Sequence, residues 1–193
     1  MTRLEKFFAI VAFSASIFGL SVSASANNYV IDTKGAHAFI NFKISHLGYS
    51  WVHGNFTDFS GSFNFDPTKP ESSSIKVDIN TDSINSSHAE RDKHLRGKKF
   101  LNVSQFPKAS FVSTKIESSD GNSARIYGDF TLKGVTKNIV IEAVKVGEGK
   151  DPWGGYRAGF SGTTKLSMAD YGMDLGPAAA DIYITLEVEG IRQ

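Results

Sequence analysis

The sequence predicts an all-β protein whose long antiparallel strands close into an extended eight-stranded β-barrel. Three observations favour this fold: apolar and polar residues alternate along most of the chain, turn signals separate the alternating segments, and only one short stretch looks helical. Closing the sheet buries the apolar faces and leaves no exposed edge strand. A β-sandwich is the alternative that the pattern leaves open.

Eight long segments show the alternation, and a short strand is expected before them at 29–32. The long segments are residues 38–45, 50–65, 75–79, 108–117, 123–132, 135–147, 155–166 and 182–188. In the first of them, Ile40 and Phe42 alternate with Asn41 and Lys43. Each such strand therefore has one apolar face for the interior of the barrel.

The segment 50–65 changes face part-way along. Val52 and Phe56 occupy even positions, whereas Phe59 and Phe63 occupy odd ones. An extra residue in a strand shifts the alternation by one, so the pattern predicts a β-bulge near Asp58 to Gly61.

One helix is predicted between the strands that end near residue 84 and begin near residue 108. Ser87 and Glu90 have the spacing of a capping box, and Gly97 suits a left-handed stop. The apolar residues that follow are Phe100, Leu101, Val103 and Phe106. They would form a lid over an open barrel end, or fill core beneath a long loop.

The first 26 residues have the features of a secretory signal peptide. Arg3 and Lys6 precede an apolar run over 7–22, and Ala24-Ser25-Ala26 supplies a small-residue cleavage pattern. The run is short and serine-rich for a membrane anchor. We expect cleavage after Ala26, export from the cytoplasm, and one domain at 27–193.

Charge and cysteine content exclude several classes of protein. Two of the 21 basic and one of the 20 acidic residues lie in the signal peptide, which leaves 19 of each sign. A balanced chain lacks the basic surface that nucleic-acid binders use. The sequence has no cysteine, which excludes disulfides, thiolate nucleophiles and a cysteine-linked lipid anchor.

No residue pattern marks a metal, cofactor or catalytic site. The five histidines are His37, His46, His53, His88 and His94, and none has the spacing of a zinc motif. His46 and His53 could meet across a hairpin, but no third ligand is evident. A Gly-x-Ser-x-Gly nucleophile motif is also missing from the sequence. We predict no metal, no cofactor and no enzymatic activity.

Several longer phrases resemble the YceI-like family. They are Asn41–Ser50, Val52–Phe63, Ala89–Leu95, Phe106-Pro107 with Ala109–Phe111, and Gly128–Lys137. The resemblance spans nearly the whole chain after the signal peptide. The stretch Gly147–Arg157 looks like that of the periplasmic proteobacterial branch.

The resemblance implies a lipocalin-like barrel whose interior tunnel binds a long amphiphile, such as a polyprenyl phosphate or a quinone tail. It also implies that the helix around residues 91–95 lies near the barrel opening. The expected function is that of a periplasmic lipid carrier, and the expected partner is an isoprenoid or fatty amphiphile. No nucleic acid and no stable membrane insertion are expected, whereas transient membrane contact and homodimer formation stay open.

Candidate ligand-binding residues follow from the alternation and the resemblance together. The candidates for the tunnel lining are Ile40, Phe42, Ile44, Phe63, Phe65, Ile79, Phe111, Ile184 and Leu186. Each could equally be ordinary core, and the tunnel hypothesis requires a continuous void between Phe42 and Leu186. Arg91 and His94 are head-group candidates, since an arginine can hold a phosphate through two hydrogen bonds. Arg91 could instead pair with Asp92 or brace the loop.

Two other functions are open at this stage. An enzyme could act on a lipid in the tunnel with His46 or His94 as general base. Alternatively, a stress-related interaction protein could use exposed aromatic residues such as Trp51 and Trp153.

Overall fold

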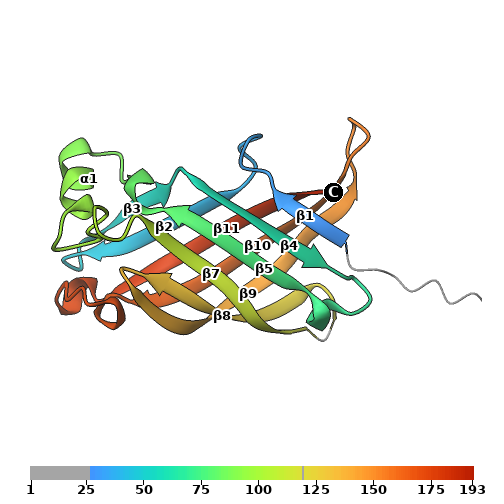
Figure 1. The fold of residues 1–193 in the computed structure, drawn as a ribbon. Helices are drawn as coiled ribbons and strands as arrows, with labels where there is room; N and C mark the ends of the chain where they lie inside the picture. Colours follow the sequence, from blue (N-terminus) through green and yellow to red (C-terminus); the bar gives the residue numbers. More distant parts are fainter. Residues whose placement is uncertain (1–26, 119) are drawn as a thin grey trace, which may run out of the picture.

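The computed structural model describes residues 27–118 and 120–193, and these form a closed antiparallel β-barrel (Figure 1). The strands are β1 (Asn27–Ile31), β2 (Phe39–His46), β3 (Ser50–Phe56), β4 (Phe59–Phe65), β5 (Ser74–Asn80), β6 (Ile84–Asn85), β7 (Lys108–Glu117), β8 (Ser123–Leu132), β9 (Val135–Lys150), β10 (Tyr156–Ser167) and β11 (Asp181–Arg192). The helix is α1 (Ala89–Arg96), and 3-10 turns are η1 (Pro70–Ser72), η2 (Thr81–Ser83), η3 (Met168–Tyr171) and η4 (Pro177–Ala179). The predicted signal peptide lies outside the described residues.

Pairing between β1 and β11 closes a ring in the order β1-β4-β5-β7-β8-β9-β10-β11. β2 continues along β11 beyond β1, β3 continues along β2, and β6 pairs with β3. β1 and β2 therefore share one strand position, as do β3 with β4 and β5 with β6. The prediction of an eight-stranded antiparallel barrel is confirmed.

The predicted bulge in segment 50–65 is a break between two strands. β3 pairs with β2 and β6, whereas β4 pairs with β1 and β5. Thr57 and Asp58 lie between them: the Thr57 N–H donates to the carbonyl of Ser83, and the Asp58 carbonyl accepts from the N–H of Asn80 at the end of β5. This break lets Phe56 and Phe59 both contact the interior, which explains the change of parity.

Helix α1 lies where it is predicted and ends at Gly97 as expected, but its N-cap and the geometry of its C-cap differ from the prediction. Its N-cap is His88, whose Nδ1 accepts a hydrogen bond from the backbone N–H of Arg91 at 3.2 Å. Ser87 precedes the cap and has a φ of 60°, which turns the chain so that His88 reaches the capping position. Gly97 is the C-cap, but its φ of −70° is extended rather than left-handed.

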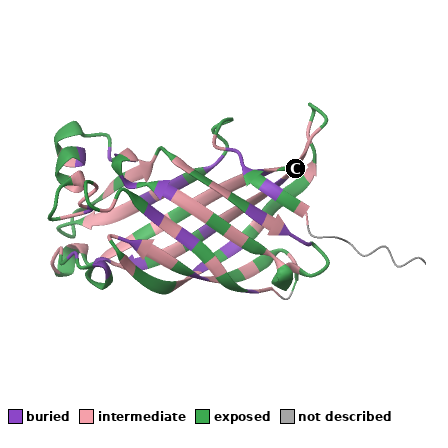
Figure 2. Ribbon diagram, viewed as in Figure 1, coloured by how far each residue is buried: buried purple, intermediate pink, exposed green. Residues whose placement is uncertain are grey.

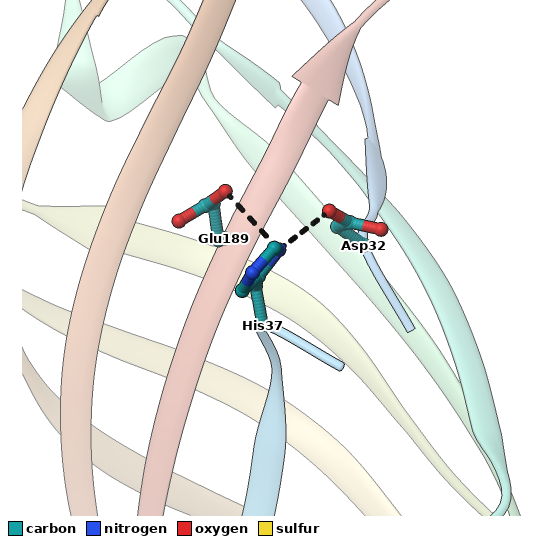
Figure 3. A group of neighbouring side chains, drawn as sticks. All are labelled: Asp32, His37 and Glu189. Carbon is teal, nitrogen blue, oxygen red and sulfur yellow. Dashed lines mark hydrogen bonds and ion pairs between the residues drawn. The ribbon is translucent and has the colours of Figure 1, made fainter. Parts of the chain in front are cut away.

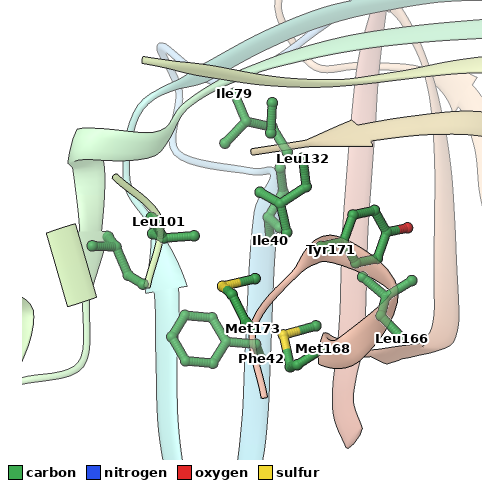
Figure 4. Close-up of a cluster of buried hydrophobic side chains, with 11 residues drawn as sticks. Ile40, Phe42, Ile79, Leu101, Leu132, Leu166, Met168, Tyr171 and Met173 are labelled. Atoms are coloured by element: carbon green, nitrogen blue, oxygen red, sulfur yellow. The ribbon is translucent and has the colours of Figure 1, made fainter. Parts of the chain in front are cut away.

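Buried side chains fill the end of the barrel beside α1 (Figure 4). Leu101 packs there with Met168, Tyr171 and Met173 from the segment after β10, and Val103 packs against the same cluster. The residues after the helix therefore fill core, which was one of the two predicted alternatives. Figure 2 shows further buried positions along the strands toward the other end, where Tyr29 stacks on Phe63.

Interior aromatic rings lie over glycines on neighbouring strands. A Cβ on Gly128 would lie 2.3 Å from Cζ of Phe111, and a Cβ on Gly54 would lie 2.3 Å from Cζ of Phe42. Each glycine leaves the space that a phenylalanine ring occupies, a pairing that curved sheets use where they bend.

Gly128→Ala is expected to lower the free energy of unfolding by about 1–3 kcal/mol, because the added methyl group overpacks the Phe111 ring. Urea unfolding measures the change. Gly149→Ala is the matched control, since a Cβ at Gly149 meets nothing within 4 Å. In a Phe111→Leu background the cost of Gly128→Ala should shrink. An equal cost in both backgrounds would show that the ring is not its cause.

Candidate functional site

Two cavities of about 100 Å³ each lie inside the barrel. They share the lining residues Ile75, Ile141, Leu186 and Val188, so they adjoin one another. We call them the inner and the outer cavity. Among the described residues, the inner cavity is lined only by those of the barrel strands. The outer cavity extends to the turns at the end of the barrel away from α1.

The inner cavity is lined almost entirely by hydrocarbon. Of its 16 described lining residues only Thr164 is polar, and the Thr164 hydroxyl donates to the backbone carbonyl of Val140 at 2.7 Å. No lining side chain is thus left to donate a hydrogen bond to a ligand. This cavity suits an apolar group and gives no orientation to a polar one.

The outer cavity begins at a cluster of aromatic rings and ends at two turns. Phe160 meets Phe63 and Phe65 edge-on, with ring centroids 5.5 and 5.2 Å apart. At its far end the lining comprises Pro70 and Ser73 of the β4–β5 connection, together with Ser118, Gly121, Asn122 and Ser123 at the β7–β8 turn. An apolar floor with polar residues at one end is the arrangement that an amphiphile requires.

Seven of the nine apolar candidates line these cavities. Ile40, Ile79, Phe111 and Ile184 line the inner cavity, Phe63 and Phe65 line the outer one, and Leu186 lines both. Phe42 and Ile44 line neither, because that part of the interior is filled. The expected continuous void from Phe42 to Leu186 is therefore wrong: Phe42 is packed in the cluster beside α1, with its ring against Gly54.

The two head-group candidates lie outside both cavities. Arg91 donates from Nε to the Ser86 hydroxyl and from Nη2 to the Ser86 carbonyl, each at 2.7 Å. Asp92 accepts from the backbone N–H and the hydroxyl of the same serine. These contacts match the bracing role for Arg91, while His94 is exposed on α1. A head-group role for Arg91 and His94 stays a prediction without support from these contacts.

Lys145 lines the outer cavity and was not predicted. β9 has a bulge at Val146, so that Lys145 lies opposite Phe160 and Gly147 lies opposite Gly159. Its Nζ is 3.4 Å from Oε1 of Glu148 and 5.8 Å from the centroid of the Phe65 ring. The apolar run around it includes Ile141 and Val144, on opposite faces, so alternation alone does not assign its direction.

Asp32, His37 and Glu189 form an unpredicted group with three possible metal ligands (Figure 3). His37 Nδ1 is 3.0 Å from Oδ2 of Asp32 and 3.8 Å from Oε1 of Glu189. Arg157 Nη1 lies 2.7 Å from the same Asp32 oxygen and 2.5 Å from the same Glu189 oxygen. Since the guanidinium already supplies the positive charge, a metal ion would have to displace it.

The ion pairs of this group shift the pKa values of its members. Hydrogen bonds from His37 and then from Arg157 lower the pKa of Asp32 to about 2, against the opposing effect of burial. The hydrogen bonds that Arg157 donates to Asp32, Asp151 and Glu189 raise the pKa of Arg157. These directions are those of a structural ion-pair network that stays charged at neutral pH.

A larger depression of about 830 Å³ lies over β7 to β10. Four of its five charged lining residues form two ion pairs: Lys115 with Glu117 at 2.6 Å, and Arg125 with Glu142 at 3.1 Å. Its charged walls offer an apolar ligand less than the interior does.

The model of the YceI-like domain family matches residues 29–190. The chain belongs to this family. The UPF0312 protein of Azotobacter vinelandii is 53% identical, with 98% of this chain and 100% of the relative covered. The UPF0312 protein of Pseudomonas aeruginosa strain LESB58 is 52% identical over the same shares of the two chains.

Solved structures agree with this YceI-like fold. The Campylobacter jejuni YCEI protein has a TM-score of 0.71 and 32% identity, covering 78% of this chain and 91% of that one. A polyisoprenoid binding domain from Saccharophagus degradans has a TM-score of 0.61, covering 86% of this chain and 98% of that one. At 12% identity, that second likeness shows the fold alone.

The histidines considered as metal ligands or as a general base, His46, His53 and His94, do not line the cavities of this YceI-like barrel. His46 lies opposite Ser50, and His53 lies opposite Lys43, so the two histidines do not pair across the hairpin.

Among the described residues no helix is both long and apolar enough to cross a membrane.

Trp51 and Trp153 are exposed, as the interaction hypothesis required. The Trp51 ring meets Tyr183 edge-on at 5.5 Å, and Lys43 Nζ lies 4.8 Å from its centroid. Trp153 is at the β9–β10 hairpin, at the opposite end of the barrel from the β2–β3 hairpin that carries Trp51 (Figure 1). The two do not form one surface.

Proposed function

We propose that this protein binds the apolar tail of an isoprenoid or similar amphiphilic lipid inside its barrel and acts as a carrier in the periplasm. The observation that carries the proposal is the pair of adjoining, largely apolar cavities, in which all but one of the polar lining residues belong to the outer cavity. The polyisoprenoid-binding neighbour and the signal-peptide pattern of residues 1–26 support the ligand class and the compartment.

Simple energetics favour a tail with more than one isoprene unit. Burying a five-carbon unit from water contributes about 4 kcal/mol, at ~0.8 kcal/mol per carbon. Association costs about 4–15 kcal/mol before any net affinity results. Several units are therefore needed for stable binding.

A tail of that size requires the interior to rearrange. A dry cavity of about 150 Å³ is known to hold a benzene molecule, so each space of about 100 Å³ holds less than one ring. Uptake must move aliphatic side chains where the cavities meet, such as Leu186 and Val188. A lipid that moves from a membrane into these cavities gains little free energy, since both surroundings are hydrocarbon. This favours exchange of lipid with membranes over its storage in the protein.

Binding rather than catalysis is the function that the site supports. The two cavities are lined by hydrocarbon, by serine, threonine and asparagine side chains, and by one lysine, while the histidines proposed as general base, His46 and His94, line neither cavity. A general base must reach the proton that it removes.

The proposal is tested by the lipid that the exported protein carries. We expect organic extraction of protein purified from the periplasm to release a near-stoichiometric lipid with an isoprenoid or long alkyl tail, identified by mass spectrometry. A protein that carries no lipid and also takes up no added prenyl lipid would refute the proposal. Chemical conversion of a bound lipid during incubation would favour the enzymatic alternative.

A further inference from the structure

The described lining of the outer cavity carries positive charge and no negative charge. Of its 23 described lining residues, only Lys145 is charged. The polar residues in the lining are Asn64, Ser73, Ser74, Ser118, Asn122, Ser123 and Ser161, and the rest are apolar or glycine. An apolar cavity with one cation and no lining carboxylate favours a ligand that carries a negative charge.

Lys145 lies on the inner face of β9, in regular alternation with the buried Ala143 and opposite Phe160. Because Val146 is the extra residue, Glu148 lies opposite the buried Ala158 and therefore on the same face as Lys145. In an unbroken strand, residues 145 and 148 would point to opposite faces. The backbone N–H of Lys145 also donates to the carbonyl of Asn122 at 2.7 Å, which ties it to the β7–β8 turn. Bulges often serve to redirect a side chain next to a functional site.

The ammonium group of Lys145 has unused hydrogen-bonding capacity. A lysine ammonium has three donors. Within the described part of the chain its one acceptor is Glu148, at 3.4 Å, which is longer than the 2.7–2.9 Å usual for charged pairs. The side chain is only 20% exposed, so water reaches it incompletely. An anionic oxygen at the mouth of the cavity would supply the missing acceptors.

We propose that Lys145 binds the anionic head group of the carried lipid, a phosphate or a carboxylate, while the tail enters the cavities beyond Phe65. The proposal rests on the lipid-binding function and makes it specific: the protein prefers an anionic amphiphile to a neutral alcohol with the same tail. It also places the head group at the end of the barrel away from α1, and thus away from Arg91 and His94.

The test compares farnesyl phosphate with farnesol, which share one tail. Binding to the lipid-stripped protein is measured by calorimetry for wild type, Lys145→Met, Lys145→Arg and Lys165→Met. Lys165 is the matched control, since it is an exposed lysine on β10 that pairs with Asp181. Thermal unfolding confirms that each variant is folded, and inorganic phosphate is titrated separately.

We expect Lys145→Met to weaken farnesyl phosphate binding roughly 10-fold to 100-fold, the range for a hydrogen bond to a charged group. Farnesol binding should be unchanged, and Lys145→Arg and Lys165→Met should resemble wild type. Equal binding of farnesyl phosphate by Lys145→Met and wild type would overturn the proposal. So would inorganic phosphate binding as tightly as the lipid, because the site would then not be coupled to the tail. Wild type that binds neither lipid would instead refute the lipid-binding function itself.

Discussion

Ala143→Phe is expected to abolish lipid uptake while leaving the barrel folded. Ala143 is buried on the inner face of β9, lines the outer cavity and lies opposite Gly162, so neither neighbour on that pair of strands carries a large side chain. A phenyl ring there fills the cavity between its mouth and its junction with the inner cavity. Excluding one five-carbon unit removes about 4 kcal/mol, or roughly 1,000-fold in Kd.

The matched control places the same ring outside the barrel. Val112 is 44% exposed on β7 and lines neither cavity, so Val112→Phe should take up prenyl lipid like wild type. Binding is measured by equilibrium titration of stripped protein, and urea unfolding reports on the fold. Retained uptake by a folded Ala143→Phe variant would show that the tail does not occupy the outer cavity.

The barrel itself could be predicted because period-two alternation specifies which residues face inward. Alternation places Ile40, Ile79 and Leu186 on inward faces, and all three line a cavity. The position of a cavity cannot be predicted in this way, because it depends on which neighbouring side chains reach across the interior and fill it. Phe42 has the same parity as Ile40 but packs against Gly54, in a region filled by Met168 and other residues of the cluster beside α1.

The site features that sequence reasoning missed depend on irregular pairing or on long separations. The bulge at Val146 falls in a stretch that is apolar on both faces, so no change of parity announces it. Arg157 and Asp32 are 125 residues apart and meet only because β11 pairs with both β1 and β10. Neither the bulge nor the ion pair between Arg157 and Asp32 can be recognised from the neighbouring residues in the sequence.

Arg157→Leu is expected to lower the free energy of unfolding at pH 7 by about 2–3 kcal/mol. The substitution leaves the carboxylates of Asp32, Asp151 and Glu189 without their shared cation. Breaking a buried ion pair typically costs 3–5 kcal/mol, and the cost here is smaller because the arginine is 21% exposed. Urea unfolding measures it. Arg125→Leu is the control, since that exposed pair with Glu142 should contribute less than about 1 kcal/mol.

The same variant should also change how stability depends on pH. The pKa of Asp32 is about 2 in the folded protein, below the ordinary value of 3.8 for an aspartate, so its ion pairs stabilise the fold above pH 4 and this contribution is lost as the pH falls toward 2. Without Arg157 the pKa of Asp32 rises toward its usual value, and the loss between pH 4 and 2 becomes smaller. An unchanged acid slope in Arg157→Leu would show that Arg157 does not hold the Asp32 carboxylate charged. Arg157 also pairs with Asp151 of the hairpin that follows β9, so the same substitution removes the ion pairs that connect this hairpin to Asp32, directly after β1, and to Glu189 of β11.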